Sequence, residues 1–109
     1  LTIVMINTIK KLLGLGPKTD YAALVKEGAI ILDVRSKGEF ASGHIKGSLN
    51  ISVDTLGKNL GQLKDKQKPI ITCCASGMRS ASAKNILKAN GYEQVHNGGS
   101  WIGLKNKIN

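Results

Sequence analysis

Two adjacent cysteines, a short loop and an arginine are the residues of this chain whose types and spacing could do chemistry. Cys73 and Cys74 end an apolar, β-branched run, and Arg79 follows five residues after the second cysteine. Such a run is typical of a strand covered on both faces, and residues 80–90 have the apolar spacing of a helix. A thiol at the mouth of a strand–loop–helix turn faces backbone N–H groups and the positive end of a helix, which lower its pKa. Arg79 adds a planar charge whose donors suit oxyanions.

Spacing distinguishes the two cysteines. Counted from Cys74, a glycine stands three residues on, at Gly77, and the pattern is Cys-x-x-Gly-x-Arg-Ser. Counted from Cys73, the pattern is Cys-x5-Arg-Ser, which superficially matches the loop of cysteine phosphatases. Those phosphatases, however, have a glycine three residues after the cysteine, and here that position is Ser76. We therefore predict that Cys74, at the end of the strand, is the nucleophile. Cys73, inside the strand, is expected to be an inert core residue.

Length and composition predict one compact domain with a basic surface. The chain has 109 residues and a net charge of +9, with fourteen lysines and only two arginines, Arg35 and Arg79. We interpret the scattered lysines as a solvated surface and not as a nucleic-acid site, because one Trp, one Phe and two Tyr offer no stacking platform. The positive field should still attract small anions.

The cysteine and histidine content argues against a disulfide framework and against a metal site. Two adjacent cysteines cannot form an ordinary disulfide, which fits a reducing compartment, and we expect a cytoplasmic protein. His44 and His96 are isolated in the sequence, and a second cysteine pair for zinc is missing. We expect neither a metal nor a cofactor.

Strands and helices are expected to alternate along the chain. Thr19 or Asp20 could cap a short helix that runs to Glu27, and residues 29–32 read as a buried strand that ends at Asp33-Val34-Arg35. The capping box Ser36-x-x-Glu39 predicts a helix that stops at Gly43, and a strand should follow up to Ile51. Asp54 could cap a loose helix over 54–63. A last strand is expected at 95–97, and a turn at 98–101 should lead into a terminal helix. This alternation predicts an α/β fold with a central parallel sheet and helices on both faces. Ligands of such sheets bind beyond the carboxyl ends of the strands, where Arg35 and Cys74 both emerge.

The first residues form a separate segment. Residues 1–18 are expected to be an amphipathic helix and a linker, and residues 19–109 the folded domain. The longest uncharged run is nine residues, which is too short to span a bilayer, so we expect no stable membrane insertion. A helix lying on a membrane surface stays an alternative. Met5 could be the native start of the chain.

Four stretches, taken in their order and spacing, resemble the single-domain rhodanese-like sulfurtransferases. They are Asp33-Val34-Arg35 with Glu39-Phe40, the turn at 43–48, the loop from Cys74 to Ser80, and Gly98-Gly99 followed by Trp101. The resemblance covers about residues 19–103. It departs from the family at the C-terminus, where the family usually has more residues between the paired glycines and the tryptophan.

The resemblance implies sulfur transfer. The Cys74 thiolate would attack the outer sulfur of a small anionic donor such as thiosulfate, sulfite would leave, and a covalent persulfide on Cys74 would pass its sulfur to a thiol or protein acceptor. The anion-binding residues implied are Arg79, the loop residues Ala75, Ser76, Gly77, Met78 and Ser80, and Arg35.

Several of these residues have a second interpretation. Arg35 could hold an ion pair instead of the donor, and Ser80 could be only the N-cap of the helix. Asp33 is expected to organise the loop, for instance by pairing with Arg35, and His44 to support a tight turn. Met78 is expected to shape the entrance of the site.

Two other functions are compatible with the same residues. One is a phosphatase or arsenate reductase that uses Cys73 or Cys74. The other is a non-catalytic rhodanese-like module that binds a partner. From Cys74 to Arg79 the loop has six residues, whereas the phosphatase relatives of the rhodanese-like fold use a longer loop of seven residues to fit a phosphate, which argues against the first. The intact cysteine and arginine argue against the second.

Overall fold

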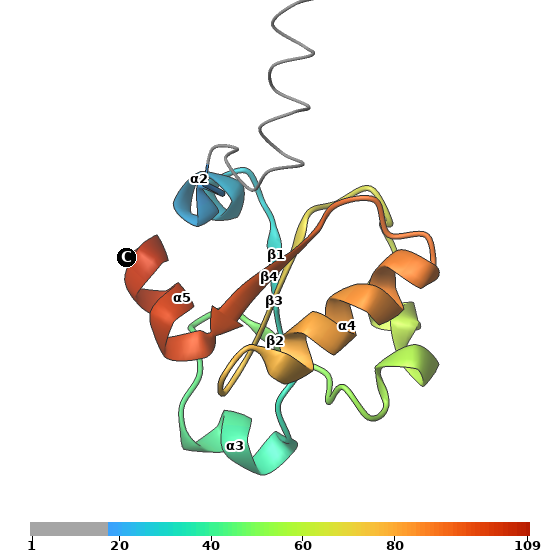
Figure 1. The fold of residues 1–109 in the computed structure, drawn as a ribbon, viewed down its shortest axis with the longest axis horizontal. Coiled ribbons are helices and arrows are strands. Elements are labelled where there is room, and N and C mark those ends of the chain that lie inside the picture. Colours follow the sequence, from blue (N-terminus) through green and yellow to red (C-terminus); the bar gives the residue numbers. More distant parts are fainter. Residues whose placement is uncertain (1–17) are drawn as a thin grey trace, which may run out of the picture.

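The computed structural model describes residues 18–109 and shows a four-stranded parallel sheet with the strand order β2-β1-β3-β4 (Figure 1). The expected helix at the start of the chain lies outside the described residues. The elements are α2 (Tyr21–Lys26), β1 (Ile30–Asp33), α3 (Lys37–Ser42), β2 (Leu49–Asn50), the 3₁₀ turns η1 (Leu56–Lys58) and η2 (Leu60–Gln62), β3 (Ile70–Cys74), α4 (Met78–Ala89), β4 (Val95–Ser100) and α5 (Trp101–Ile108).

Helices cover both faces of the sheet, as the alternating pattern predicted. The helices α2 and α5 lie on one face of the sheet (Figure 1). They pack over a core that contains Ile71, Cys73 and Leu104. On the other face α4 and η1 pack over a larger core that contains Ile70, Cys74 and Leu87. Successive side chains of a strand point to opposite faces, so the two adjacent cysteines belong to different cores.

Local capping follows the sequence closely. The Asp20 carboxylate accepts a hydrogen bond from the Ala23 N–H and caps α2. At α3, Ser36 and Glu39 form the expected capping box, and the helix ends before Gly43. Gly91, with a φ of +90°, follows α4 in the left-handed conformation expected of a residue after a helix end.

Three expectations about the elements were wrong. Residues 54–63 form two 3₁₀ turns instead of one helix, and Asp54 does not cap them; glycines at 57 and 61 weaken a longer helix there. The helix after the loop begins at Met78 behind the cap residue Gly77, so Ser80 lies inside the helix and is not its N-cap. The last strand continues through residues 98–100, because the paired glycines stay in the sheet instead of forming a turn.

The carboxyl ends of the strands gather the candidate residues at one edge of the sheet. Asp33 pairs with Cys73 in the parallel register of β1 and β3, which brings the segment after β1 beside the loop after β3. In β4 the register shifts, so that Thr72 lies opposite Asn97 but Cys74 lies opposite Ser100. Among residues 18–109, no helix has both the length and the apolar character needed to cross a bilayer.

Candidate active site

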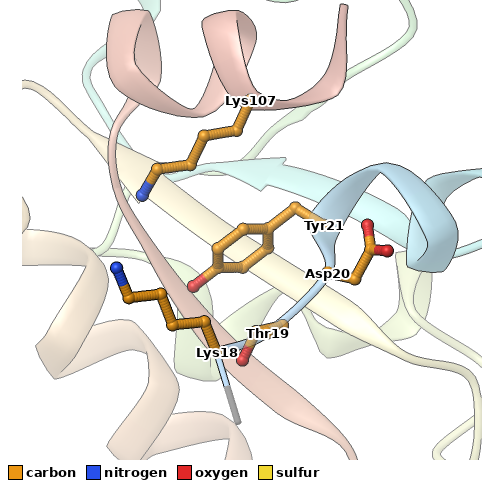
Figure 2. A pocket seen from close by; sticks show the side chains of 5 residues that line it. All are labelled: Lys18, Thr19, Asp20, Tyr21 and Lys107. Atoms are coloured by element: carbon orange, nitrogen blue, oxygen red, sulfur yellow. The ribbon is translucent and has the colours of Figure 1, made fainter.

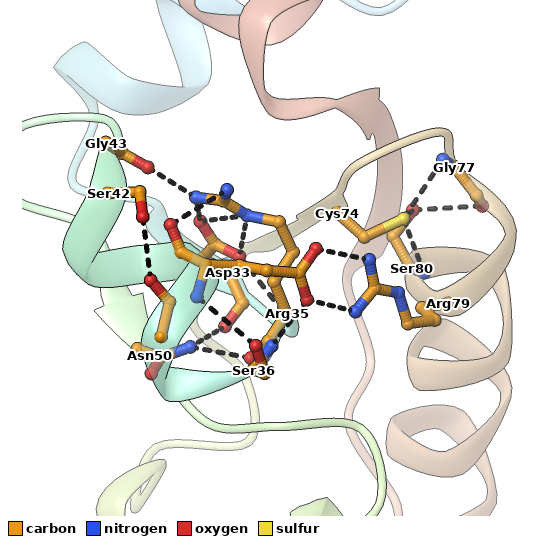
Figure 3. Close-up of polar contacts among 12 residues, drawn as sticks. Asp33, Arg35, Ser36, Ser42, Gly43, Asn50, Cys74, Gly77, Arg79 and Ser80 are labelled. Atoms are coloured by element: carbon orange, nitrogen blue, oxygen red, sulfur yellow. Dashed lines mark hydrogen bonds and ion pairs between the residues drawn. The ribbon is translucent and has the colours of Figure 1, made fainter.

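The sulfur of Cys74 lies beneath the first turn of α4 and accepts backbone hydrogen bonds. The N–H groups of Gly77 and Ser80 point at Sγ, with N···S distances of 3.0 and 3.4 Å, and the Ser80 hydroxyl oxygen lies 3.5 Å away (Figure 3). The tight turn depends on Gly77, whose φ of +104° is in the left-handed region. The result is a small cup of hydrogen-bond donors around one sulfur atom.

This cup makes Cys74 more acidic than an ordinary cysteine. Burial raises the pKa of the thiol, but hydrogen bonds from the hydroxyl and N–H of Ser80 and from the N–H groups of Gly77 and Ser76 outweigh burial and bring the pKa below 9.0. A thiolate in this position is stabilised without a separate general base.

The thiol of Cys74 is also screened from solvent. Its side chain has no exposed area, whereas Ala75, Ser76 and Met78 in the loop above it are exposed, Met78 to 79%. In this conformation the loop covers the sulfur. Met78 lies in this loop, and its expected role at the entrance stays a prediction.

Cys73 has the opposite environment. Its side chain is fully buried in the core under α2 and α5, and burial, followed by the nearby Asp33 carboxylate, raises the pKa of its thiol to about 12. A thiol with this pKa stays protonated at neutral pH and is a poor nucleophile.

Arg79 is engaged by a residue that sequence reasoning treated only as part of a capping box. Its two terminal nitrogens donate to the two carboxylate oxygens of Glu39, at 2.6 and 2.9 Å, and the side chain extends toward α3 (Figure 3). This hydrogen-bonded pair lowers the pKa of Glu39 to about 2. The two side chains are 38% and 39% exposed, so an anion in solution can compete for the guanidinium. A signal in the sequence existed, because a carboxylate and an arginine followed strands that end at the same sheet edge.

Arg35 has a different setting, since its guanidinium is held on several sides. It donates through Nε and one terminal nitrogen to the buried Asp33 carboxylate, with a shortest distance of 2.7 Å, and to the carbonyl oxygens of Glu39 and Gly43 (Figure 3). The Trp101 ring covers it at 4.7 Å. The Arg35 side chain is only 6% exposed. This geometry favours the ion-pair interpretation of Arg35 over the donor clamp.

Asp33, the partner of Arg35, and His44 both interact with backbone or ring groups of neighbouring turns. Asp33 also accepts a hydrogen bond from the Arg35 N–H, so its carboxylate shapes the turn after β1. The ring of His44 stacks on Phe40 with 3.7 Å between centroids, and its Nδ1 lies 2.7 Å from the Phe40 carbonyl oxygen. Both positions are those of turn-supporting residues.

Asn97 is a site residue that sequence reasoning missed. Its Oδ1 accepts a hydrogen bond of 2.6 Å from the hydroxyl of Ser80, and its Nδ2 donates to the carbonyl oxygen of Gly77. The sequence showed only a polar residue before two glycines. The contact joins residues of a strand and a helix that lie seventeen residues apart, and it depends on how β4 and α4 pack together, which a sequence pattern does not reveal.

A separate hollow of about 600 Å³ lies between the start of α2 and α5 (Figure 2). It is lined by Lys18, Thr19, Asp20, Tyr21 and Lys107. These side chains include no thiol, and the Nζ of Lys107 lies over the Tyr21 ring at 5.5 Å. We therefore place the candidate chemistry at Cys74 and not in this hollow.

Fold and site together define an α/β domain in which a cysteine of lowered pKa lies among backbone N–H donors at the carboxyl edge of a parallel sheet. The chain belongs to the Rhodanese-like domain family, which it matches over residues 18–101.

Solved structures agree with this assignment, and the chain is also similar to curated proteins. The chain is 39% identical over 72 residues to the uncharacterized protein YibN of Escherichia coli, covering 64% of this chain and 50% of that protein. The human single-domain sulfurtransferase TSTD1 superposes with a TM-score of 0.69 at 28% identity, covering 78% of this chain and 88% of that one. A rhodanese with anions from E. coli superposes with a TM-score of 0.66 at 27% identity, covering 70% and 91%. The chain spans about half the length of the first curated relatives it matches.

Proposed function

We propose that this chain is a sulfurtransferase that carries a sulfane sulfur as a persulfide on Cys74. The observation that carries the proposal is the sulfur of Cys74, which accepts hydrogen bonds from the Gly77 and Ser80 N–H groups and has a pKa below its ordinary value. Soft sulfur needs a polarisable nucleophile, and a thiolate is the one such nucleophile that an amino-acid side chain provides.

With thiosulfate as donor, the reaction has two displacements at sulfur. The Cys74 thiolate attacks the outer sulfur of thiosulfate, a new S–S bond forms, and the bond to the sulfonate sulfur breaks with its electron pair leaving on sulfite. An acceptor thiolate then attacks the outer sulfur of the persulfide, takes it as its own persulfide, and returns Cys74 as the thiolate. Charge is conserved in both steps, and no external oxidant or reductant is consumed.

Two groups at the site have separate tasks in this scheme. The N–H groups of the loop from Ala75 to Ser80 hold the negative persulfide, and removal of one such donor typically costs about 10²–10³-fold in rate. Arg79 binds the sulfonate oxygens of the donor after exchanging its Glu39 partner for them. Arg35, held by Asp33, keeps the neighbouring turn in place.

The alternatives from sequence reasoning have less support. A phosphatase with the longer loop would need Cys73, whose side chain is buried in the core and whose pKa is raised to about 12. A purely binding module would not need an acidic thiol. The similar human structure is named a sulfurtransferase and the similar E. coli structure a rhodanese with anions, which supports sulfur transfer over these alternatives.

We further propose that the chain works without a metal or organic cofactor in the cytoplasm. Both cysteines are free thiols in the structure, which suits a reducing compartment. The proposed partners are a small anionic donor and a thiol on a small molecule or protein, and neither a nucleic acid nor stable membrane insertion is part of the proposal.

Mass spectrometry of the intact chain tests the function. Incubation with thiosulfate should add the mass of one sulfur atom to the wild-type chain and to Cys73→Ser, and cyanide should remove it. Cys74→Ser should stay unmodified. An unmodified wild-type chain, or sulfur retained in Cys74→Ser, would contradict the proposal.

A further inference from the structure

The hydroxyl of Ser80 has one proton and three neighbours that interact with it. Its oxygen lies 3.5 Å from the sulfur of Cys74, 2.6 Å from the Oδ1 of Asn97 and 3.0 Å from the carbonyl oxygen of Gly77. A hydroxyl donates one hydrogen bond and accepts up to two. The shortest distance, to Asn97, marks the preferred acceptor while Cys74 is a neutral thiol, because the thiol can then donate to the hydroxyl oxygen.

Ionisation of Cys74 changes what this hydroxyl should do. A thiolate has no proton to donate and is a strong acceptor, so the Ser80 O–H is drawn toward the sulfur and away from Asn97. The Asn97 Oδ1 then keeps only the N–H of Gly99, at 3.0 Å. Asn97 and the thiolate thus compete for the same proton.

Asn97 is held in a position to compete. Its Nδ2 donates to the Gly77 carbonyl at 3.3 Å, and its own backbone carbonyl accepts a hydrogen bond from the Tyr21 hydroxyl at 3.1 Å. Asn97 lies opposite Thr72 in the parallel register of β3 and β4, near the end of β3 from which the chain turns into α4. The residue is half-buried.

We propose that Asn97 is a positioning residue that restrains the ionisation of Cys74 by holding the Ser80 hydroxyl proton. The proposal rests on the function above, in which Cys74 works as a thiolate. The N–H groups of Gly77 and Ser80 lower the pKa of Cys74, whereas the proposal assigns to Asn97 an effect that raises it. Loss of the Asn97 side chain should therefore make Cys74 more acidic.

The other charged groups near the site are unchanged by a substitution at residue 97. Each element packed around the loop contributes some of them. The charged and titratable groups are Asp33 and Arg35 at the end of β1, Arg79 in α4 with its partner Glu39 in α3, His96 in β4 with the α4 lysines Lys84 and Lys88, and the neutral thiol of Cys73 in β3.

The ultraviolet absorbance of the thiolate, followed against pH with Cys74→Ser as the blank, measures the pKa directly and requires no sulfur donor. Asn97→Ala should lower the pKa of Cys74 by about half a unit to one unit, the size of one hydrogen bond. Ser80→Ala should raise it, because the thiolate loses a donor. In the Ser80→Ala background Asn97→Ala should have no effect, since there is no hydroxyl proton to hold.

The control is Ser100→Ala, which removes the hydroxyl that caps α5 at the same end of β4 and should leave the pKa unchanged. If Asn97→Ala does not fold, Asn97→Leu, which has a similar volume, should lower the pKa in the same way. A pKa that is unchanged or raised by loss of Asn97, or lowered equally without Ser80, would overturn the proposal. Because the titration uses no donor, a chain that fails to take sulfur from thiosulfate but shows this pattern would refute the proposed function alone.

Discussion

Glu39 in α3 binds both terminal nitrogens of Arg79 in α4, with N···O distances of 2.6 and 2.9 Å. The arginine that could clamp the donor is therefore already paired with a carboxylate of the same chain. Both partners are partly exposed, and solvent screening weakens an ion pair of this kind. A donor anion can displace a partner held this weakly.

Glu39→Gln should lower the KM for thiosulfate because it removes the competing charge from Arg79. The expected change is about two- to fivefold, in line with the free energy of an exposed ion pair. Glutamine keeps an oxygen that can accept the Ser36 N–H, so the capping box should survive. Steady-state kinetics check this, with Arg79→Ala, which should raise KM, as the comparison. An unchanged or higher KM in Glu39→Gln would mean that Glu39 orients Arg79 and does not compete for it.

The same pair predicts how stability depends on pH. The hydrogen bond from Arg79 lowers the folded-state pKa of Glu39 from 4.5 to about 2, so the stabilisation is complete above pH 4.5 and is lost as the pH falls toward 2. The difference in Tm between wild type and Glu39→Gln should be constant from pH 5 to 7. It should shrink as the pH falls from 4.5 toward 2. Thermal unfolding followed by circular dichroism at several pH values gives the measurement. A difference that grows on acidification would contradict the lowered pKa.

Alkylation should discriminate between the two cysteines. Cys74 should react with iodoacetamide with a pH midpoint below 9.0, because its hydrogen bonds favour the thiolate. Cys73, with a pKa of about 12 and no exposed area, should stay unmodified in the folded chain and react only in denaturant. Peptide mass spectrometry identifies the modified site. Since the Cys74 side chain is screened, its maximal rate should lie below that of a free thiolate; modification of Cys73 in the native chain would contradict the structure.

The Arg35 ion pair should matter for stability. Asp33 is fully buried and Arg35 nearly so, and removal of one partner leaves the other as an uncompensated buried charge. Arg35→Ala should therefore cost about 3–5 kcal/mol of the free energy of unfolding. Urea denaturation measures this, with the exposed Lys46→Ala as a control that should change stability little. A loss below about 1 kcal/mol would mean that the pair is not a scaffold.

The two glycines before Ser100 should differ in what they tolerate. A Cβ at Gly98 would lie 2.8 Å from a methyl carbon of Ile71 and 2.9 Å from the carbonyl oxygen of Thr72, whereas a Cβ at Gly99 would meet nothing within 4 Å. Gly98→Ala should cost at least about 1–3 kcal/mol because the neighbouring strand cannot give way. Gly99→Ala should cost about 1–2 kcal/mol from its φ of +79° alone. Gly98→Ala should also displace β4 beside Asn97, which the titration of the Cys74 thiolate would detect. A larger loss of stability in Gly99→Ala than in Gly98→Ala would contradict this packing.

Much of the fold could be predicted because its signals are local. The apolar run into Cys74, the capping box at Ser36 and the glycine after α4 each depend on residues within one turn or strand. Alternation of such elements led to the parallel sheet with covered faces, and the strand ends predicted which edge holds the site. The loose helix over 54–63 was mispredicted because apolar spacing does not distinguish a weak helix from successive 3₁₀ turns.

The sequence by itself determined which atom is the candidate nucleophile, since the glycine spacing and the position at the end of a strand both single out Cys74. Only the tertiary structure decided the partners of the charged and polar groups around it. Glu39 and Arg79 are forty residues apart, and Ser80 and Asn97 are seventeen apart. The physical reason is that hydrogen bonds over such separations depend on strand register and helix placement, which the packing of the whole core sets.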